Sequence, residues 1–372
     1  MKKILMFAVL LAGAFTLASC QAAETTFKVA MVTDVGDIDD KSFNQGTWEG
    51  IVEWAEENNV SHKYYRPTAD EDDARLAAID LAVAGGAEIV VTPGFMFEVV
   101  IYTAQTKYPD VKFVLIDGAP HAGDYATYET TANTKSILFK ENESGFLAGY
   151  ASVMEGYREL GFMGGIAVPA VVRFGLGYIA GAYHAARELE ATAWEFDPAN
   201  YTYLGGFGPS DEIKTQAASW YSNGVEIIHV AAGGAGNSVM LAAEESESGM
   251  VVGVDVDQAA QSPKVITSAM KALGVVVKQA LTEWLEEVNG TGTFQGGETV
   301  TLGAAEEAVG LPLGESFRFT TFTEAQYEEI LAKLVDGTVS VPFTVDELGT
   351  FLEALGVGAA EVTALQAAVS GE

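Results

Sequence analysis

Strand-like and helix-like segments alternate along most of the chain. Each strand-like run is four or five residues long and is bounded by turn-forming or helix-like sequence. This alternation is typical of parallel sheets whose strands are joined by right-handed crossovers. We therefore predict an α/β fold. The predicted strands are Lys28–Val32, His62–Tyr65, Glu88–Val91, Lys112–Ile116, Leu160–Gly164, Tyr201–Leu204, Glu226–Val230 and Met250–Val254.

The strands form two sets of about four that divide near Leu138–Ser144, which predicts two similar lobes. A further strand at Val265–Ala269 returns the chain towards the first lobe and precedes a long helix at Lys271–Val288. The earlier predicted helices are Phe43–Glu57, Asp70–Ala84, Phe97–Lys107, Gly145–Tyr157, Gly175–Leu189, Asp211–Ser222 and Asn237–Glu247. The expected first lobe is 27–138 plus about 260–290, the second is 139–259 plus about 291–342, and 343–372 is a helical extension without an assigned role.

The charge of the chain excludes one large class of partner. Its 372 residues include 20 basic and 52 acidic side chains, which give a formal net charge of −32. A chain of this charge is repelled by nucleic acid and by anionic lipid headgroups. Its apolar content of 49% is too high for a disordered chain. We therefore expect a folded protein that does not bind nucleic acid.

The N-terminus predicts export and a lipid anchor. Two lysines precede the apolar stretch Ile4–Leu17, which is too short to span a bilayer as an ordinary helix. The stretch ends in LASC at Cys20, which resembles a bacterial lipobox. We predict a signal peptide of residues 1–19, lipidation of Cys20 and an anchored linker over 20–26, facing the periplasm or the cell exterior. The alternative is an ordinary secretory signal. Cys20 is the only cysteine, so neither a disulfide within the chain nor a thiolate metal site can form.

Acidic residues follow the first predicted strand, where open α/β sheets bind ligands. The sequence TDVGDIDD at 33–40 resembles the calcium-binding signature of nucleoside hydrolases, but Val32 occupies the leading ligand position and the Asp39-Asp40 pair is displaced by one residue. Lys41 breaks an EF-hand pattern. We therefore predict no metal here. For Asp39 and Asp40 we favour capping of the following helix, because acids stabilise a helix N-terminus.

Three other motifs do not predict chemistry. The glycine-rich turn at Gly233–Gly236 lacks the third glycine of a dinucleotide-binding loop, and no Walker-type lysine follows. We interpret it as a tight turn that lets a ligand or the other lobe approach the backbone. Ser268-x-x-Lys271 matches the first motif of penicillin-recognising enzymes, but their other motifs are absent. The four histidines are not spaced as zinc ligands.

Several segments together resemble the basic membrane protein (Bmp) family of bacterial lipoproteins, whose characterised members include purine nucleoside receptors of ABC importers. They occur in family order between about residue 27 and Pro342. The matching segments are Val32–Gly36, Asp39–Gln45, Trp48–Gly50, FVLIDG at 113–118, GFLAGY at 145–150, AAGGAG at 231–236, GVDVDQ at 253–258 and TSAMK at 267–271. The resemblance implies a type I periplasmic-binding-protein fold, with two Rossmann-like lobes, parallel sheets and crossover strands between them.

The resemblance also implies a ligand site between the lobes. It places two aromatic rings against a purine and carboxylates at the base and the ribose. Phe43 and Phe207 match the stacking positions, and Asp34 and Asn44 match positions that contact the base. Asp117 matches a binding acid, Asp255 and Lys271 match ribose-binding positions, and Gly234 offers its backbone. Asp257 is the alternative to Asp255, because the two face opposite ways on an extended segment.

The expected function is therefore that of a lipid-anchored substrate-binding protein without catalysis. It would bind purine nucleosides, use no cofactor or metal, and deliver its ligand to the permease and ATPase subunits of an ABC importer. One alternative is a calcium-dependent nucleoside hydrolase. The other is the same fold with a different small ligand, such as a sugar or a signalling molecule.

Overall fold

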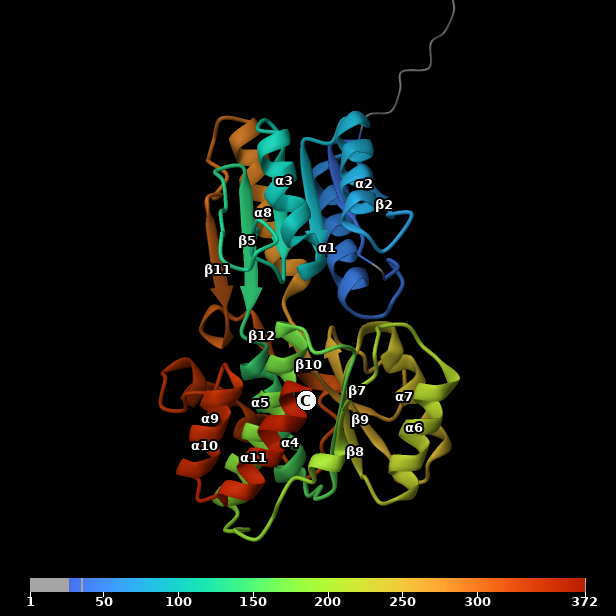
Figure 1. Cartoon of the computed structure of the whole chain (residues 1–372), viewed down its shortest axis with the longest axis vertical. Coiled ribbons are helices and arrows are strands. Elements are labelled where there is room, and N and C mark those ends of the chain that lie inside the picture. The colour runs from blue at the N-terminus through green and yellow to red at the C-terminus, as the bar shows by residue number, and fades with distance from the viewer. Residues whose placement is uncertain (1–26, 35, 372) are drawn as a thin grey trace, which may run out of the picture.

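The computed structural model describes residues 27–34 and 36–371, which fold into two α/β lobes stacked end to end (Figure 1). Each lobe is built on a six-stranded sheet. The two-lobed α/β architecture predicted from the sequence is therefore confirmed. The predicted signal peptide, Cys20 and the linker lie outside the described residues. Among the helices of the described part of the chain, none is both long and apolar enough to cross a membrane.

The first lobe has the strand order β11-β5-β4-β3-β1-β2, and all its strand pairs are parallel. Successive residues of β1 point to opposite faces, so Val29 and Met31 pack with α1 and α8 while Ala30 and Val32 pack with α2 and α3. The elements are β1 (Val29–Val32), α1 (Phe43–Asn58), β2 (His62–Tyr65), α2 (Asp72–Ala84), β3 (Ile89–Pro93), α3 (Glu98–Lys107), β4 (Lys112–Ile116), β5 (Thr134–Phe139), α8 (Leu273–Val288) and β11 (Glu298–Leu302).

The second lobe repeats this arrangement in the order β12-β10-β9-β8-β6-β7, except that β12 is antiparallel to β10. Its sheet is covered by α4 and α5 on one side and by α6 and α7 on the other (Figure 1). The elements are α4 (Glu141–Glu155), β6 (Leu160–Gly164), α5 (Pro169–Glu188), β7 (Tyr201–Tyr203), α6 (Asp211–Ser222), β8 (Ile227–Ala231), α7 (Gly236–Glu245), β9 (Met250–Asp255), β10 (Val265–Lys271), β12 (Val309–Gly310) and α9 (Glu324–Val335).

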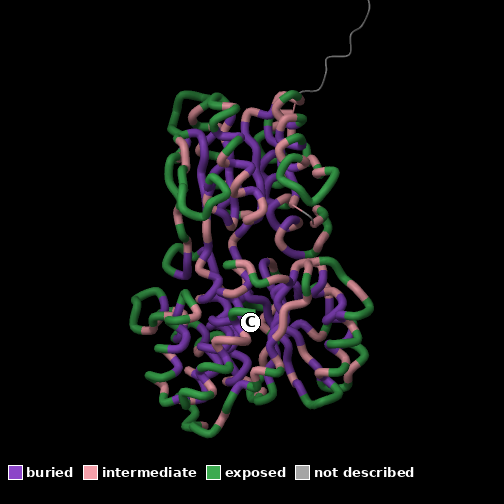
Figure 2. The backbone as a smooth tube through the Cα atoms, in the orientation of Figure 1, coloured by how far each residue is buried: buried purple, intermediate pink, exposed green. Residues whose placement is uncertain are grey.

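Facing glycines bring α4 and α5 into close contact. A Cβ added at Gly149 would lie 2.0 Å from the carbonyl oxygen of Tyr178, and one at Gly181 would lie 1.9 Å from that of Phe146. Any larger residue would push the helices apart. The GFLAGY segment is therefore required for packing of the second lobe, and Figure 2 shows buried residues concentrated along the strands and inner helix faces of both lobes.

The chain crosses between the lobes three times, after β5, after β10 and after β11. This corrects the expected lobe boundaries. Residues about 260–290 were assigned to the first lobe, but β10 pairs in parallel with β9 of the second lobe and only α8 returns to the first. Residues about 291–342 were assigned to the second lobe, but β11 extends the first sheet beside β5. Strand β11 therefore forms an edge of the first sheet, and β10 lies between β9 and β12 in the second.

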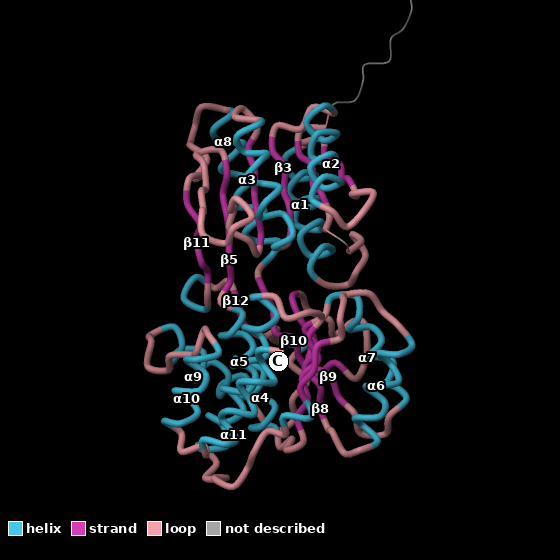
Figure 3. Tube along the Cα trace, in the orientation of Figure 1, coloured by secondary structure: helices cyan, strands magenta, loops and turns pink. Residues whose placement is uncertain are grey.

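The observed elements differ from the prediction mainly at this edge (Figure 3). The strands β5, β11 and β12 were not predicted, so each sheet has six strands rather than about four. Helix α5 begins at Pro169, six residues before the predicted start at Gly175. Proline at the first helical position is a start signal, because its missing N–H would have no partner there. The earlier start brings the N-terminus of α5 to the interface between the lobes.

The C-terminal extension folds against the second lobe. Helices α10 (Val345–Ala354) and α11 (Ala359–Ser370) pack against α5, and α11 also contacts β7. Buried leucines and valines of both helices join the core of that lobe. The hydroxyl of Tyr203 donates to the carbonyl oxygen of Val369 at 2.6 Å. The extension is therefore an integral part of the second lobe.

Candidate ligand-binding site

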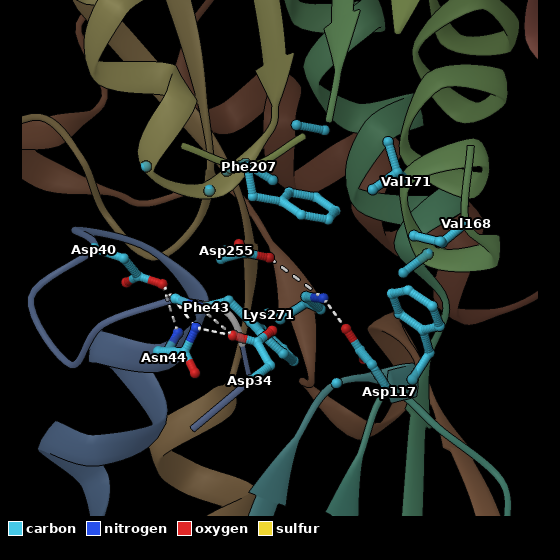
Figure 4. A pocket seen from close by; sticks show the side chains of 18 of the residues that line it. Asp34, Asp40, Phe43, Asn44, Asp117, Val168, Val171, Phe207, Asp255 and Lys271 are labelled. Atoms are coloured by element: carbon cyan, nitrogen blue, oxygen red, sulfur yellow. Dashed lines mark hydrogen bonds and ion pairs between the residues drawn. The ribbon is translucent and has the colours of Figure 1, made fainter. Parts of the chain in front are cut away.

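A cavity of about 690 Å³ lies between the lobes, at the carboxyl ends of both sheets (Figure 4). This volume is within the usual range for small-molecule sites. All eight residues that the sequence predicts to contact a ligand line this cavity. They are Asp34, Phe43, Asn44, Asp117, Phe207, Gly234, Asp255 and Lys271.

The first-lobe wall is organised around Asp34, just after β1. One oxygen of Asp34, Oδ1, accepts hydrogen bonds from the backbone N–H of Gly36 at 2.7 Å and from Nδ2 of Asn44 at 2.9 Å. The same Asn44 nitrogen donates to Oδ2 of Asp40 at 3.0 Å (Figure 4). Two carboxylates on one side of Asn44 fix its amide orientation, because the amide oxygen would be repelled there.

Burial raises the pKa of two carboxyl groups in this wall. It raises the pKa of Asp34 to about 6, against the lowering effect of the hydrogen bonds from Gly36 and Asn44. Burial likewise raises the pKa of Asp40, although three backbone N–H groups and Asn44 donate to it. An N–H group of a ligand that donates to Asp34 would favour the ionised form.

The capping hypothesis holds for Asp40. Its carboxylate accepts from the backbone N–H groups of Ser42, Asn44 and Gln45 at 2.9 to 3.0 Å, which are the unpaired donors at the start of α1. Asp39 is exposed at the cavity mouth and accepts no such bond in the described part of the chain. Asp40 thus places Phe43 and Asn44 on the first turn of the helix.

Two phenylalanine rings reach the cavity from opposite lobes. Phe43 begins α1, and Phe207 lies in the loop after β7. A Cβ at Gly165 would lie only 2.3 Å from the ring of Phe207, so glycine is needed there to admit the ring. The carbonyl oxygen of Phe207 accepts from the backbone N–H of Ala235 at 2.8 Å, which ties its loop to the glycine-rich turn containing Gly234.

Lys271 is the charged centre of the cavity. It ends β10, and its Nζ lies 2.5 Å from Asp117 and 3.3 Å from Asp255 (Figure 4). The same nitrogen lies 3.8 Å from Glu141. Its ammonium also lies 4.7 Å from the ring centre of Phe43. Burial alone would lower the pKa of Lys271, but the three carboxylates raise it, so the ammonium stays charged.

The two aspartates that bind Lys271 occupy matching positions in the two lobes. Asp117 follows β4 and Asp255 ends β9, and both have a positive φ, of 57° and 65°. Such a backbone conformation costs energy for residues other than glycine and is concentrated at functional sites. Burial, opposed by the charge of Lys271, raises the pKa of Asp117. The alternative, Asp257, is exposed and does not line the cavity.

Hydrogen bonds close the lobes over the cavity. The carbonyl oxygen of Lys41 accepts from Nε2 of Gln258 at 2.8 Å and from Nε2 of Gln261 at 2.9 Å. The hydroxyl of Ser42 donates to Oδ2 of Asp255 at 2.6 Å. We call the contact of Lys41 with the two glutamines the amide clamp. It joins the lobes away from the three crossovers, so this conformation is closed.

Sequence reasoning missed part of the second-lobe wall. Val168–Val171, Arg173 and Phe174 line the cavity from the start of α5, and Glu141 lies behind Lys271. Pro169 was the signal for the early start of this helix. In the described ranges, 27–34 and 36–371, no group of three or more His, Cys, Asp or Glu side chains could hold a metal ion.

Solved structures share this two-lobed arrangement. An ABC transporter solute-binding protein from Aeropyrum pernix K1 superimposes with a TM-score of 0.73, at 24% identity, over 92% of this chain and 99% of the other. A solute-binding protein from Conexibacter woesei DSM 14684 gives a TM-score of 0.65 at 19% identity, over 85% and 99%. The chain therefore has the type I periplasmic-binding-protein fold, the fold of two-lobed solute-binding proteins.

Sequence relationships define the family more narrowly. The family described as "ABC transporter substrate-binding protein PnrA-like" (Bmp) matches residues 27–343. The ABC transporter nucleoside-binding protein BmpA of Lactococcus lactis subsp. cremoris is 28% identical over 92% of this chain and 99% of its own length. Basic membrane protein B of Borreliella burgdorferi is 26% identical over 94% and 97%. The chain belongs to the PnrA-like family of ABC transporter substrate-binding proteins.

Proposed function

We propose that this protein is a purine nucleoside receptor of an ABC importer and has no catalytic activity. The observation that carries the proposal is the pair of rings, Phe43 and Phe207, which enter one cavity from opposite lobes beside the aspartates that line it. The name of the Lactococcus relative, a nucleoside-binding protein, supports the same ligand class. A nucleoside fits this chemistry because it combines a flat aromatic base with a sugar rich in hydroxyl groups.

The proposed roles are those that the resemblance to the family implies for side chains that line the cavity. The rings of Phe43 and Phe207 stack on the faces of the base. Asp34 accepts from an N–H of the base, and Asn44 contacts the base edge. Asp117 is a further acid that binds the ligand. Asp255 accepts from ribose hydroxyls and Lys271 donates to them. Gly234 contributes only its backbone to the site.

A thermal-shift screen tests the ligand class. Purine nucleosides, free bases, sugars and pyrimidine nucleosides would be added to the mature protein, and a tight ligand raises the melting temperature by mass action. We expect purine nucleosides to give the largest shifts. Incubation with inosine, followed by chromatography, tests catalysis. Release of hypoxanthine and ribose that chelation abolishes would favour the nucleoside hydrolase alternative instead.

We also propose that Cys20 carries a lipid that holds the receptor at the outer face of the cell membrane, where it meets the permease. The lipobox-like sequence before this residue supports the proposal. Labelling of cells with a radioactive fatty acid should mark the wild-type protein and leave Cys20→Ser unlabelled. Equal labelling of both proteins would contradict it.

Nucleoside affinity should fall as the pH is lowered from 7 to 5. The N–H of a base donates to the ionised form of Asp34, and burial raises the pKa of that group to about 6 in the empty protein. Binding must then release a proton at low pH, so affinity should be about tenfold weaker at pH 5. Calorimetry with inosine at both pH values measures this. Asp34→Asn should bind inosine more weakly, and its affinity should no longer change near pH 6. Tighter binding of inosine to the wild type at pH 5 than at pH 7 would contradict this role of Asp34.

Weakening the amide clamp should reduce affinity for every ligand by the same factor. Gln261→Met keeps the size of the side chain but loses the bond to Lys41, whose net value is about 0.5–1.5 kcal/mol. The closed state then becomes less populated, and apparent affinity falls with it. Calorimetry with inosine and adenosine, together with the radius of gyration from X-ray scattering, measures both effects. Gln295→Met, in a first-lobe loop, is the control, and unequal losses for the two ligands would contradict the clamp.

A further inference from the structure

Arg173 is a second cation at the cavity, and the proposed nucleoside contacts give it no role. It lies on the second turn of α5, lines the cavity and is only 8% exposed. Its Nε donates to Oε2 of Glu141 at 2.5 Å. Glu141 is fully buried, and its other oxygen, Oε1, accepts no hydrogen bond in the described part of the chain and lies 3.8 Å from the Lys271 ammonium. Glu141 therefore lies between two cations.

The distances from the Lys271 ammonium to its three carboxylates agree with the pairing of Glu141 and Arg173. Three buried carboxylates face the ammonium, yet it lies closest to Asp117 at 2.5 Å and farthest from Glu141 at 3.8 Å. Arg173 neutralises Glu141 from the opposite side. If Glu141 lacked that partner, its charge would be unpaired in the protein interior, which is costly, and the flexible lysine could relieve the cost by moving towards it.

We propose that Arg173 is a positioning residue for the ligand site. Because Arg173 pairs with Glu141, the Lys271 ammonium stays directed at Asp117 and Asp255, where it faces the cavity. Arg173 thus acts on the ligand through Glu141 and Lys271 rather than by touching it. The inference rests on the proposed function wherever nucleoside affinity is the readout, but the position of Lys271 can be tested in the empty protein.

The segment after α9 holds Arg173 in place. The guanidinium carbon lies 4.9 Å from the ring centre of Phe343, close enough for a cation–π interaction. The backbone N–H of Phe343 donates to Glu347 at 2.7 Å, at the start of α10. Nδ2 of Asn142, beside Glu141, donates to the carbonyl oxygen of Val341 at 3.2 Å. The C-terminal helices therefore support the charged network from behind the cavity.

A double variant separates this role from direct ligand contact. Arg173→Met leaves Glu141 unpaired, whereas Arg173→Met combined with Glu141→Gln removes both charges and leaves Lys271 with its two aspartates. We expect the single variant to bind inosine about tenfold or more weakly, a difference of about 1.4 kcal/mol. The double variant should recover most of that affinity. Arg187→Met is the matched control, since Arg187 lies on the same helix against Tyr183 and away from the cavity.

The side-chain ammonium resonance of Lys271, assigned by its loss in Lys271→Met, gives a readout that needs no ligand. It should shift in Arg173→Met and return in the double variant. Loss of inosine affinity without recovery in the double variant would overturn the inference and assign Arg173 to direct contact. If the wild type bound no nucleoside, the proposed function would fail. The resonance would then decide the inference alone, because an unshifted signal in Arg173→Met would overturn it.

Discussion

Lys271→Met should abolish nucleoside binding and destabilise the protein by about 3–5 kcal/mol, the cost of leaving buried charges without their partner. The ammonium is the shared counter-ion of Asp117, Asp255 and Glu141, whose side chains are at most 8% exposed. Methionine keeps the length of the side chain and removes only the charge. Urea unfolding measures the stability, and calorimetry with inosine measures the affinity.

The pH dependence of this variant gives a second check. The charge of Lys271 lowers the pKa of Asp117 against the effect of burial, so its removal should raise that pKa further. An acid whose pKa is higher in the folded state than in the unfolded state binds its proton more tightly when folded. The stability of Lys271→Met should therefore decrease as the pH rises from 5 to 7.

Lys278→Met is the matched control for both measurements. Lys278 lies on α8, is partly exposed and pairs with Glu53 on the surface. Surface ion pairs contribute little, about 0–1 kcal/mol. A Lys271→Met protein as stable as this control, with unchanged inosine affinity, would contradict the central position of Lys271 in the site.

Phe43→Ala and Phe207→Ala should each weaken purine nucleoside binding by about fivefold to 150-fold, since stacking on an aromatic side chain is worth about 1–3 kcal/mol per base. The Phe43 variant should lose more, because its ring also lies against the Lys271 ammonium. Leucine at either position restores apolar area but not the flat surface, so it should recover only part of the loss. Calorimetry with inosine and guanosine measures each variant.

Tyr125→Ala controls for the loss of an aromatic ring as such. Tyr125 is 76% exposed and does not line the cavity, so its variant should bind like the wild type. The two phenylalanine variants also test the alternative that the fold binds another kind of molecule. If both keep nearly full affinity for the ligand that the thermal screen identifies, that ligand is not held by stacking, and a sugar or signalling compound becomes the better interpretation.

Most of the architecture could be predicted because its signals are local. Strands such as His62–Tyr65 and Lys112–Ile116 end where the sequence indicates, and the order of strand and helix predicts the parallel sheets. Lobe membership was wrong for β10 and β11, because strand pairing depends on segments that are distant in the sequence. Nothing within β11 (Glu298–Leu302) shows that it will join β5 of the first lobe, more than 150 residues earlier in the chain.

The same contrast between local and long-range signals applies to the residues of the candidate site. Residues placed at strand ends or helix starts, such as Asp34 and Phe43, could be located from their neighbours along the chain. Glu141 and Arg173 could not, because each looks like an ordinary charge just before a predicted helix until the fold buries them against each other. Lys271 on β10 shares the second lobe with two of its partners, Asp255 on β9 and Glu141 on α4, and only Asp117, just after β4, comes from the first lobe.

The amide clamp has a consequence for how a two-lobed substrate-binding protein can change during evolution. Its acceptor is the main-chain carbonyl of Lys41, so substitution of that side chain leaves the acceptor in place. Lys41 has a φ of 63°, so glycine there would relieve strain and keep the carbonyl available. Substitution of Gln258 or Gln261 would remove a hydrogen bond of the clamp, because the side-chain amides of these residues are its donors. Ease of closure can therefore be adjusted from the second lobe without altering any side chain that would touch the ligand.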